Sequence, residues 1–362
     1  MNERNVGIDM LRIVSTIMVV FLHVLSQGGI LKALGDFNVK GEIMWFLQII
    51  CYSAVNIFAL ISGYIGFGKK HRIESLLMLW LQVALYSLLS MILIGVFAFE
   101  RVSVKECVGA LLPVVSGQSW YFSAYFPLFL LMPILDMIID CIDKKVLIRG
   151  GISVFLFFLV AETFVHVEEF GINKGYSVLW LMLLYLVGAY IKKYNIQKKL
   201  TSKRCLVGIF ICTVMTFLSK LAIEGVTLIV VGRPVYGTKF IAYTSPLMVA
   251  QAIFFLVLFL HIRVKSCIAK LVSWLSPMTF GVYIIHTTNV VYRYLLRDAF
   301  VFLEKCSLLG IICVSIMATA IIYVICSIID WVRIKLFAFL GVGNLLKNIT
   351  NKFNLIPNLL SK

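Results

Sequence analysis

The first long apolar segment of the chain, residues 8–28, contains two residues that a lipid environment disfavours, Arg12 and His23. They are eleven positions apart, and an α-helix turns by about 100° per residue, so their side chains point within roughly 20° of each other. The helix rise separates them by about 16 Å. An imidazole titrates near neutral pH and can take a proton from a hydroxyl, whereas a guanidinium binds phosphate. Ionisable residues inside a membrane segment indicate a functional site.

Both residues also have a purely structural interpretation. His23 is equally consistent with a packing histidine that hydrogen-bonds to a neighbouring helix. Arg12 is equally consistent with an arginine whose head group reaches the lipid headgroups. Asp9 lies three residues before Arg12 and on the same helix face, where it can pair with the guanidinium. In the functional interpretation His23 is a catalytic base, Arg12 anchors a phosphate or pyrophosphate, and Asp9 belongs to the same site.

Two further segments place glycine, polar and aromatic residues in apolar surroundings. Ser62, Gly63 and Tyr64 end the run "NIFALISGY". There the serine can bond across helices and the glycine permits close packing, so packing is the simpler interpretation and substrate contact the alternative. Trp120 and Tyr121 open the run "WYFSAYFPLFLLMP". Aromatic residues at this position either belong to the belt at the membrane surface or stack on sugar rings.

A second histidine within an apolar segment is His286, in "LSPMTFGVYIIHTTNVVYR". Tyr283 precedes it by three residues and shares its helix face. Two histidines together with buried charges exceed what packing usually needs, so we place Tyr283 and His286 at a substrate site. The nine cysteines are scattered and no His/Cys group has the spacing of zinc ligands, so we predict no metal site.

The composition is that of a membrane protein. Hydrophobic residues make up 61% of the chain and charged residues 14%, against about a quarter charged in soluble domains. The mean hydropathy is +1.00. Apolar runs long enough to cross a bilayer recur along the chain, so we expect an all-α polytopic membrane protein of about ten transmembrane helices. The predicted spans are residues 8–28, 45–67, 73–97, 119–139, 150–168, 176–192, 205–223, 244–262, 274–296 and 308–332.

The loops between these spans alternate in charge. The side that holds the N-terminus has 22 of the 33 lysines and arginines, so the positive-inside rule places both termini in the cytoplasm. We expect a multi-pass protein of the plasma (inner) membrane of a bacterium. The net charge of +16 does not indicate nucleic-acid binding, because the basic residues form short clusters between apolar spans.

The chain is expected to divide into a membrane domain, residues 1–332, and a short cytoplasmic tail, residues 333–362. The tail contains "IKLFAFLGVGNLLKNI", a pattern typical of an amphipathic helix at a membrane surface.

Taken in order, four segments resemble the acyltransferase-3 family of multispanning membrane acyltransferases. They span residues 9–286 and are Asp9-x-Leu11-Arg12 followed by His23, "NIFALISGY", "WYFSAYFPLFLLMP" and "TFGVYIIH". The first is fairly specific, and the others gain weight from their order and spacing.

The resemblance implies transfer of an acyl group, usually acetyl, from cytoplasmic acyl-CoA to a hydroxyl of an envelope polysaccharide, a glycolipid or another sugar-containing acceptor. By position, His23 would be the catalytic histidine and Arg12 its essential partner. Arg72 would match basic residues that bind the donor after the Ser-Gly-Tyr helix. The chain departs from the family there, since it reads "KKHRIESLLMLWLQV" where relatives often have paired arginines and a proline.

These expectations fit acetyl-CoA as the donor. Its phosphates would stay at the basic inner mouth while the pantetheine arm spans the roughly 16 Å from Arg12 to His23. Direct transfer and a covalent acetyl-histidine both stay open. A glycan transporter or flippase is the main alternative, because intramembrane charges also mark transport pathways, although no paired repeats with broken helices are found. A second alternative is a non-catalytic membrane sensor or assembly partner.

Overall fold

The computed structural model describes residues 5–97, 103–117, 119–160 and 171–360 of the chain. Every regular element in these ranges is a helix, which confirms the predicted all-α membrane fold. The α-helices are α1 (Val6–Ser26), α2 (Ile30–Leu34), α3 (Val39–Tyr52), α4 (Ala54–Gly66), α5 (Ile73–Phe97), α6 (Val104–Leu111), α7 (Pro113–Ser116), α8 (Trp120–Cys141), α9 (Lys144–Val160), α10 (Val178–Lys193), α11 (Ser202–Val231), α12 (Pro246–Leu260), α13 (Ser266–Leu275), α14 (Thr279–His286), α15 (Leu308–Phe339) and α16 (Val342–Leu360).

Seven helical segments among the described residues are long and apolar enough to cross a bilayer. They are Val6–Ser26, Val39–Gly66, Ile73–Phe97, Trp120–Cys141, Ser202–Val231, Ser266–His286 and Leu308–Phe339. The remaining three predicted spans correspond to shorter helices. The span at 244–262 is the 15-residue α12, and that at 176–192 is the 16-residue α10. The span at 150–168 overlaps α9, and its residues 161–168 lie outside the described residues.

The predicted span at 274–296 is not one continuous helix. It comprises the end of α13, a 3₁₀ turn (η6, Ser276–Met278), α14, and a π-helix (η7, Val290–Leu296). Pro277 lies in the 3₁₀ turn, and a proline has no N–H with which to continue an α-helical ladder. The final predicted span also differs, because α15 continues past residue 332 to Phe339 and the tail helix α16 begins only at Val342.

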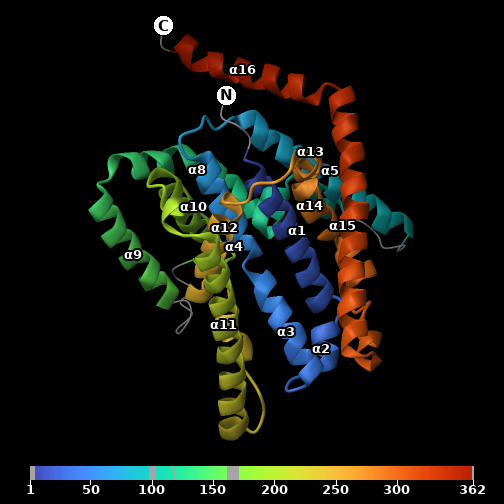
Figure 1. The fold of residues 1–362 in the computed structure, drawn as a ribbon. Coiled ribbons are helices and arrows are strands. Elements are labelled where there is room, and N and C mark those ends of the chain that lie inside the picture. Colours follow the sequence, from blue (N-terminus) through green and yellow to red (C-terminus); the bar gives the residue numbers. More distant parts are fainter. Residues whose placement is uncertain (1–4, 98–102, 118, 161–170, 361–362) are drawn as a thin grey trace.

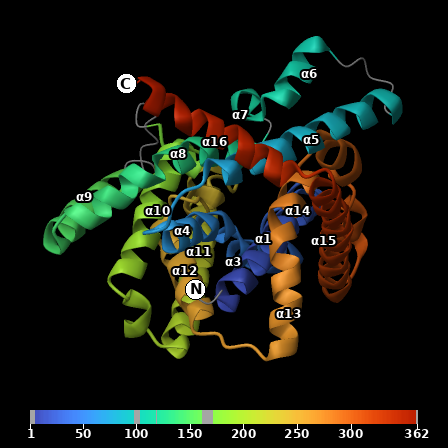
Figure 2. The same ribbon diagram turned by 90° about the horizontal axis from the view of Figure 1, so that it is seen from above.

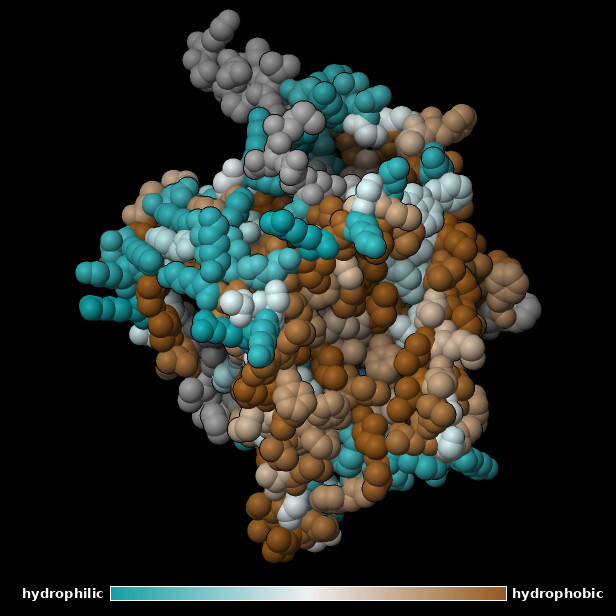
Figure 3. Space-filling view, viewed as in Figure 1, coloured by the Kyte–Doolittle hydropathy of each residue, from teal (hydrophilic) through white to brown (hydrophobic). Residues whose placement is uncertain are grey.

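Figure 1 shows that α1 begins, and α15 ends, at the same end of the bundle, which we call the termini face. The helix α16 lies across this face, as the view from above confirms (Figure 2). On the side shown in Figure 3, apolar residues cover the middle of the bundle, and hydrophilic residues gather toward the termini face and, in a smaller group, at the lower right. The helix α1 lies inside the bundle, in contact with α3, α4, α12, α13, α14 and α15.

A buried carboxylate joins α5, α14 and α15. Asp330 on α15 accepts hydrogen bonds from Gln82 (2.8 Å) and Tyr86 (2.7 Å) on α5, and from two nitrogens of Arg333 (both 2.9 Å). On α14, a Cβ atom at Gly281 would overlap the Asp330 carboxylate, so only glycine allows this approach. Arg333, the first residue of the predicted tail, is buried beside this carboxylate.

Two glycines bring α4 and α10 into backbone contact. A Cβ atom at Gly63 would overlap the backbone oxygen of Tyr185, and one at Gly188 would overlap that of Leu60. Close approach through small residues is the usual way in which helices associate in a membrane. Gly63 therefore serves helix packing, the simpler of its two interpretations.

We predict that Gly63→Ala lowers the free energy of unfolding by about 1–3 kcal/mol, because the added methyl forces α4 and α10 apart. Thermal unfolding in detergent measures the change. Gly225→Ala on α11 is the matched control, since no atom lies within 4 Å of a Cβ built there. Equal melting temperatures for the two variants would contradict the packing role of Gly63.

Candidate active site

A cavity of about 640 Å³ lies inside the bundle, beside α1. Helices α4, α5, α8 and α14 and the segments around residues 176, 243 and 290 form its other walls. Its lining is a mixture of aromatic, apolar and hydroxyl side chains with one arginine and one histidine. The lining residues are Arg12, Val19, Leu22, His23, Val55, Phe58, Ile61, Ser62, Leu79, Ser119, Trp120, Tyr121, Tyr125, Tyr176, Tyr243, Ser276, Pro277, Thr279, Phe280, Tyr283, Thr287, Asn289 and Tyr292.

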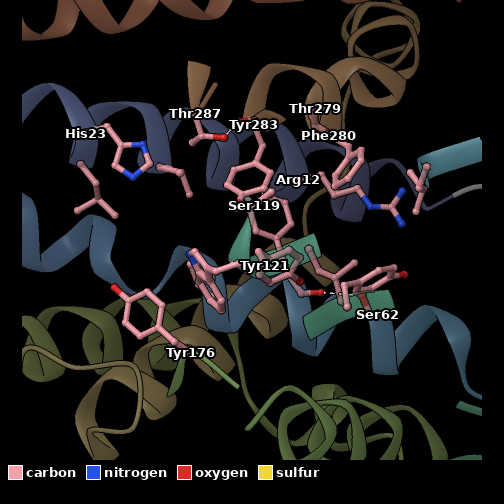
Figure 4. Close-up of a pocket in the computed structure, with 18 of the residues that line it drawn as sticks. Arg12, His23, Ser62, Ser119, Tyr121, Tyr176, Thr279, Phe280, Tyr283 and Thr287 are labelled. Carbon is pink, nitrogen blue, oxygen red and sulfur yellow. Dashed lines mark hydrogen bonds between the residues drawn. The ribbon is translucent and has the colours of Figure 1, made fainter. Parts of the chain in front are cut away.

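Arg12 and His23 both line this cavity, as their spacing on one face of α1 predicts. Figure 4 shows them toward opposite ends of the group of lining residues, with Tyr283 and Tyr121 between them. Arg12 lies nearer the termini face, because α1 begins there. The helix rise places His23 about 16 Å deeper in the protein.

Arg12 is held at the cavity wall by a buried carboxylate. One guanidinium nitrogen donates to Asp9 Oδ1 at 3.2 Å, and the Ser276 hydroxyl donates to the same oxygen at 2.9 Å. The side chain of Asp9 is 5% exposed, whereas that of Arg12 is 35% exposed. Asp9 therefore lies behind Arg12, outside the lining, and positions a guanidinium that can offer further N–H donors to an anion.

His23 contacts two aromatic rings at the deeper end of the cavity. Its Nδ1 atom lies 2.9 Å from Nε2 of His286. The edge of its ring meets Tyr292 at a centroid distance of 5.3 Å. His286 is fully buried and is not among the lining residues, so the structure places it behind His23, away from the position predicted for a substrate contact.

Aromatic side chains surround the cavity between these two ends. The Trp120 ring lies 4.5 Å from that of Tyr176 and stacks on that of Tyr243 at 6.0 Å. The Tyr121 ring meets that of Tyr283 edge-on at 6.0 Å. We call these five residues the aromatic cluster. Three of them, Trp120, Tyr121 and Tyr283, are predicted site residues, and Tyr283 also accepts a hydrogen bond from Ser119 at 3.3 Å.

The sequence patterns do not identify two members of the aromatic cluster, Tyr176 and Tyr243, because these residues lie at the edges of predicted spans. Asn56 fixes one of them. Its side-chain amide donates to the backbone oxygen of Tyr243 at 2.8 Å and accepts from Trp180 Nε1 at 3.1 Å. Asn56 is fully buried in the apolar helix α4. A single amide side chain within an apolar segment is the sequence feature that indicates such a contact between helices.

The remaining predicted site residues divide between the cavity and the termini face. Ser62 lines the cavity, whereas Tyr64, two residues later, does not. Arg72 is exposed in the segment between α4 and α5. That segment is tied to α8, because Asp136 accepts from the Gly68 N–H at 3.2 Å and lies 3.1 Å from His71 Nε2. Across the described residues, no group of three or more His, Cys, Asp or Glu side chains is arranged to hold a metal.

The comparisons with known proteins agree with this architecture. The acyltransferase-3 family model, described as an acyltransferase domain, matches residues 5–328. The chain therefore belongs to that family, and it is a multi-pass membrane acyltransferase. No curated protein and no solved structure matches it.

We predict that Asn56→Ala loosens the wall that carries Tyr243. The change removes two buried hydrogen bonds, and the loss of a partner by a buried polar group costs about 1–3 kcal/mol. A lower melting temperature and a weaker near-ultraviolet circular dichroism signal from the buried aromatic rings are the expected results. Asn348→Ala on the exposed face of α16 is the control, and an Asn56→Ala variant as stable as this control would show that the bridge is unimportant.

Proposed function

We propose that the protein is a membrane O-acyltransferase of the bacterial plasma membrane. In this proposal it moves an acetyl group from cytoplasmic acetyl-CoA to a hydroxyl of an envelope polysaccharide, a glycolipid or another sugar-containing acceptor. The observation that carries the proposal is that one cavity has Arg12 near one end, His23 near the other and the aromatic cluster between them.

The donor enters from the termini face in this proposal. The positive-inside rule makes that face cytoplasmic. Lys69, Lys70 and Arg72 are exposed there, in the segment anchored by Asp136. Their charges and the guanidinium of Arg12 suit the phosphates of acetyl-CoA. The pantetheine arm is apolar enough to enter the cavity, and the distance of about 16 Å along α1 brings the thioester near His23.

The acceptor meets the aromatic cluster. The C–H faces of a sugar ring pack against flat aromatic side chains, and the tyrosine hydroxyls supply hydrogen-bond partners for its hydroxyl groups. Trp120, Tyr176 and Tyr243 lie close to one another beside the cavity and offer such faces. This arrangement favours a carbohydrate acceptor that approaches from the side opposite the termini face.

The chemistry is one acyl transfer between a thioester and an alcohol. His23 Nε2 takes the proton of the acceptor hydroxyl as its oxygen attacks the acetyl carbon. The tetrahedral intermediate then collapses, the C–S bond breaks, and the leaving thiolate takes the proton back from the imidazolium of His23. The products are the acetyl ester and free coenzyme A, and the histidine returns to its initial state.

We predict that His23→Ala lowers the rate of acetyl transfer by about 10²–10⁴-fold, because the general base is lost. Mass spectrometry of envelope glycans from cells that express wild type or variant, in a background without the native gene, measures the acetyl mass difference. Equal membrane abundance and equal melting temperature of the two proteins are the control.

Undiminished acetylation in the His23→Ala cells would remove His23 from the mechanism. Glycans without any acetyl difference, together with uptake of labelled glycan by vesicles that contain no acetyl-CoA, would refute the proposed function in favour of a transporter.

We predict that Arg12→Lys raises the KM for acetyl-CoA by about 10- to 100-fold. An ammonium paired with Asp9 has no planar fork of donors left for a phosphate, and a charge-assisted hydrogen bond is worth about 1.5–3 kcal/mol. Steady-state kinetics of the protein in nanodiscs, with the donor varied at saturating acceptor, measures the change. A KM altered only for the acceptor would contradict the assignment of Arg12 to the donor.

A further inference from the structure

His286 has a hydrogen-bond partner on each ring nitrogen, although it does not reach the cavity. Its Nδ1 atom lies 2.6 Å from the backbone oxygen of Val282, one turn earlier on α14. Its Nε2 atom lies 2.9 Å from Nδ1 of His23. His286 is fully buried, and the centroids of the two imidazole rings are 5.0 Å apart. These contacts form a chain that runs from the Val282 carbonyl through His286 to His23.

The direction of each hydrogen bond in this chain follows from its first member. A carbonyl oxygen only accepts, so the proton of a neutral His286 ring lies on Nδ1. Its Nε2 is then an acceptor, and His23 has to donate from Nδ1. A neutral His23 with its proton on Nδ1 has an unprotonated Nε2. This nitrogen lies on the far side of the ring from His286.

The cavity lies on the side of His23 on which its unprotonated Nε2 would act as a base. His23 lines the cavity, and His286 does not. In Figure 4 the His23 ring projects from α1 toward the side on which Tyr121 and Tyr176 lie. The Tyr292 ring meets the His23 ring edge-on, at an interplanar angle of 87°, and restricts its rotation. The base is therefore held in one orientation by contacts on α14 and η7.

We propose that His286 is a positioning residue that fixes His23 in the tautomer with an unprotonated Nε2. The proposal rests on the proposed function, in which that nitrogen takes the proton of the acceptor hydroxyl. When His23 becomes an imidazolium, its Nδ1–H still donates to His286 Nε2 and spreads the new charge toward the Val282 carbonyl. No proton leaves His286, and the proton on His23 Nε2 passes to the thiolate when the C–S bond breaks.

A histidine that only packs helices together would make the same contacts, so the test has to separate the two roles. His286→Leu removes the acceptor for His23 and keeps an apolar side chain on α14. His286→Gln keeps an amide oxygen that accepts from His23 and an amide N–H₂ that donates to Val282. His261→Leu is the matched control, because His261 lies at the end of α12, away from the cavity, and its Nε2 also bonds backbone oxygens.

We predict that His286→Leu lowers kcat about 10²–10⁴-fold with little change in the KM for acetyl-CoA, as expected for a base in the wrong tautomer. His286→Gln is expected to recover at least tenfold of this loss, and His261→Leu to retain wild-type kcat. The assay uses the full-length protein in nanodiscs, with labelled acetyl-CoA and extracted envelope glycan. Equal kcat in wild type and His286→Leu, or equal loss in the leucine and glutamine variants, would overturn the proposal.

Nitrogen-15 NMR of histidine-labelled wild-type protein gives a second measurement, which reads the tautomer of His23 with His286 in place. The chain has five histidines, and the His23→Ala sample assigns the His23 signals. A protonated Nδ1 and an unprotonated Nε2 in His23 are expected, and the opposite tautomer would overturn the proposal.

The two proposals fail in different ways. If wild type transfers acetyl and His23→Ala does not, yet His286→Leu is fully active, only the role of His286 falls. If wild type transfers no acetyl group, the proposed function falls whichever tautomer the spectrum shows.

Discussion

Hydrocarbon offers no hydrogen-bond partners, and this constraint shapes the whole bundle. A guanidinium and an imidazole on one helix face can exist within a membrane only if protein encloses that face. Here the helix that carries them, α1, packs against α3, α4, α12, α13, α14 and α15 and lies inside the bundle. Enclosing α1 leaves a cavity along its polar face, and both groups line it. The hydrocarbon surroundings thus account both for the enclosure of α1 and for the position of the cavity beside it.

The helices around α1 pack through close contacts that leave no room for an added side-chain carbon. At Gly63, Gly188 and Gly281 a single added carbon would overlap a neighbouring backbone or carboxylate. The carboxylate beside Gly281 belongs to Asp330, which accepts two hydrogen bonds from α5 and two from Arg333 on its own helix. Because these contacts also determine where α14 lies, they determine where His286 meets His23. Residues without access to the cavity therefore control its geometry.

Much of this architecture follows from sequence patterns that reflect simple physics. The length of the apolar runs defines the long helices, and the period of the α-helix places Arg12 and His23 on one face. The pairing of Arg12 with Asp9 follows from their spacing. Such local relations depend only on neighbours along the chain, and a single sequence displays them fully.

Relations between distant segments are not visible in this way. Nothing local distinguishes Tyr176 and Tyr243 from other aromatic residues at span ends, and only the packing of α4 against the neighbouring helices brings them to the cavity. The role of Gly63 depends on where α10 lies, and the burial of Arg333 depends on Asp330 beside it. His286 shares a helix face with Tyr283, yet the path of α14 turns it toward His23. In each case the deciding partner is more than a hundred residues away or belongs to a helix whose end the pattern misplaces.

The lining residues of the cavity are divided between one continuous helix, α1, and several separate elements. Arg12 and His23 belong to one helix, so the distance between them stays constant while other helices move. The aromatic cluster comes from α8, α14 and two connecting segments, around residues 176 and 243. A fixed distance suits a donor of constant length, since the span from phosphate to thioester is the same in every turnover. In the proposed reaction α1 would therefore hold the chemistry, and the separate elements that carry the aromatic cluster would hold the specificity, a division seen widely in proteins whose functional loops stand on a stable scaffold.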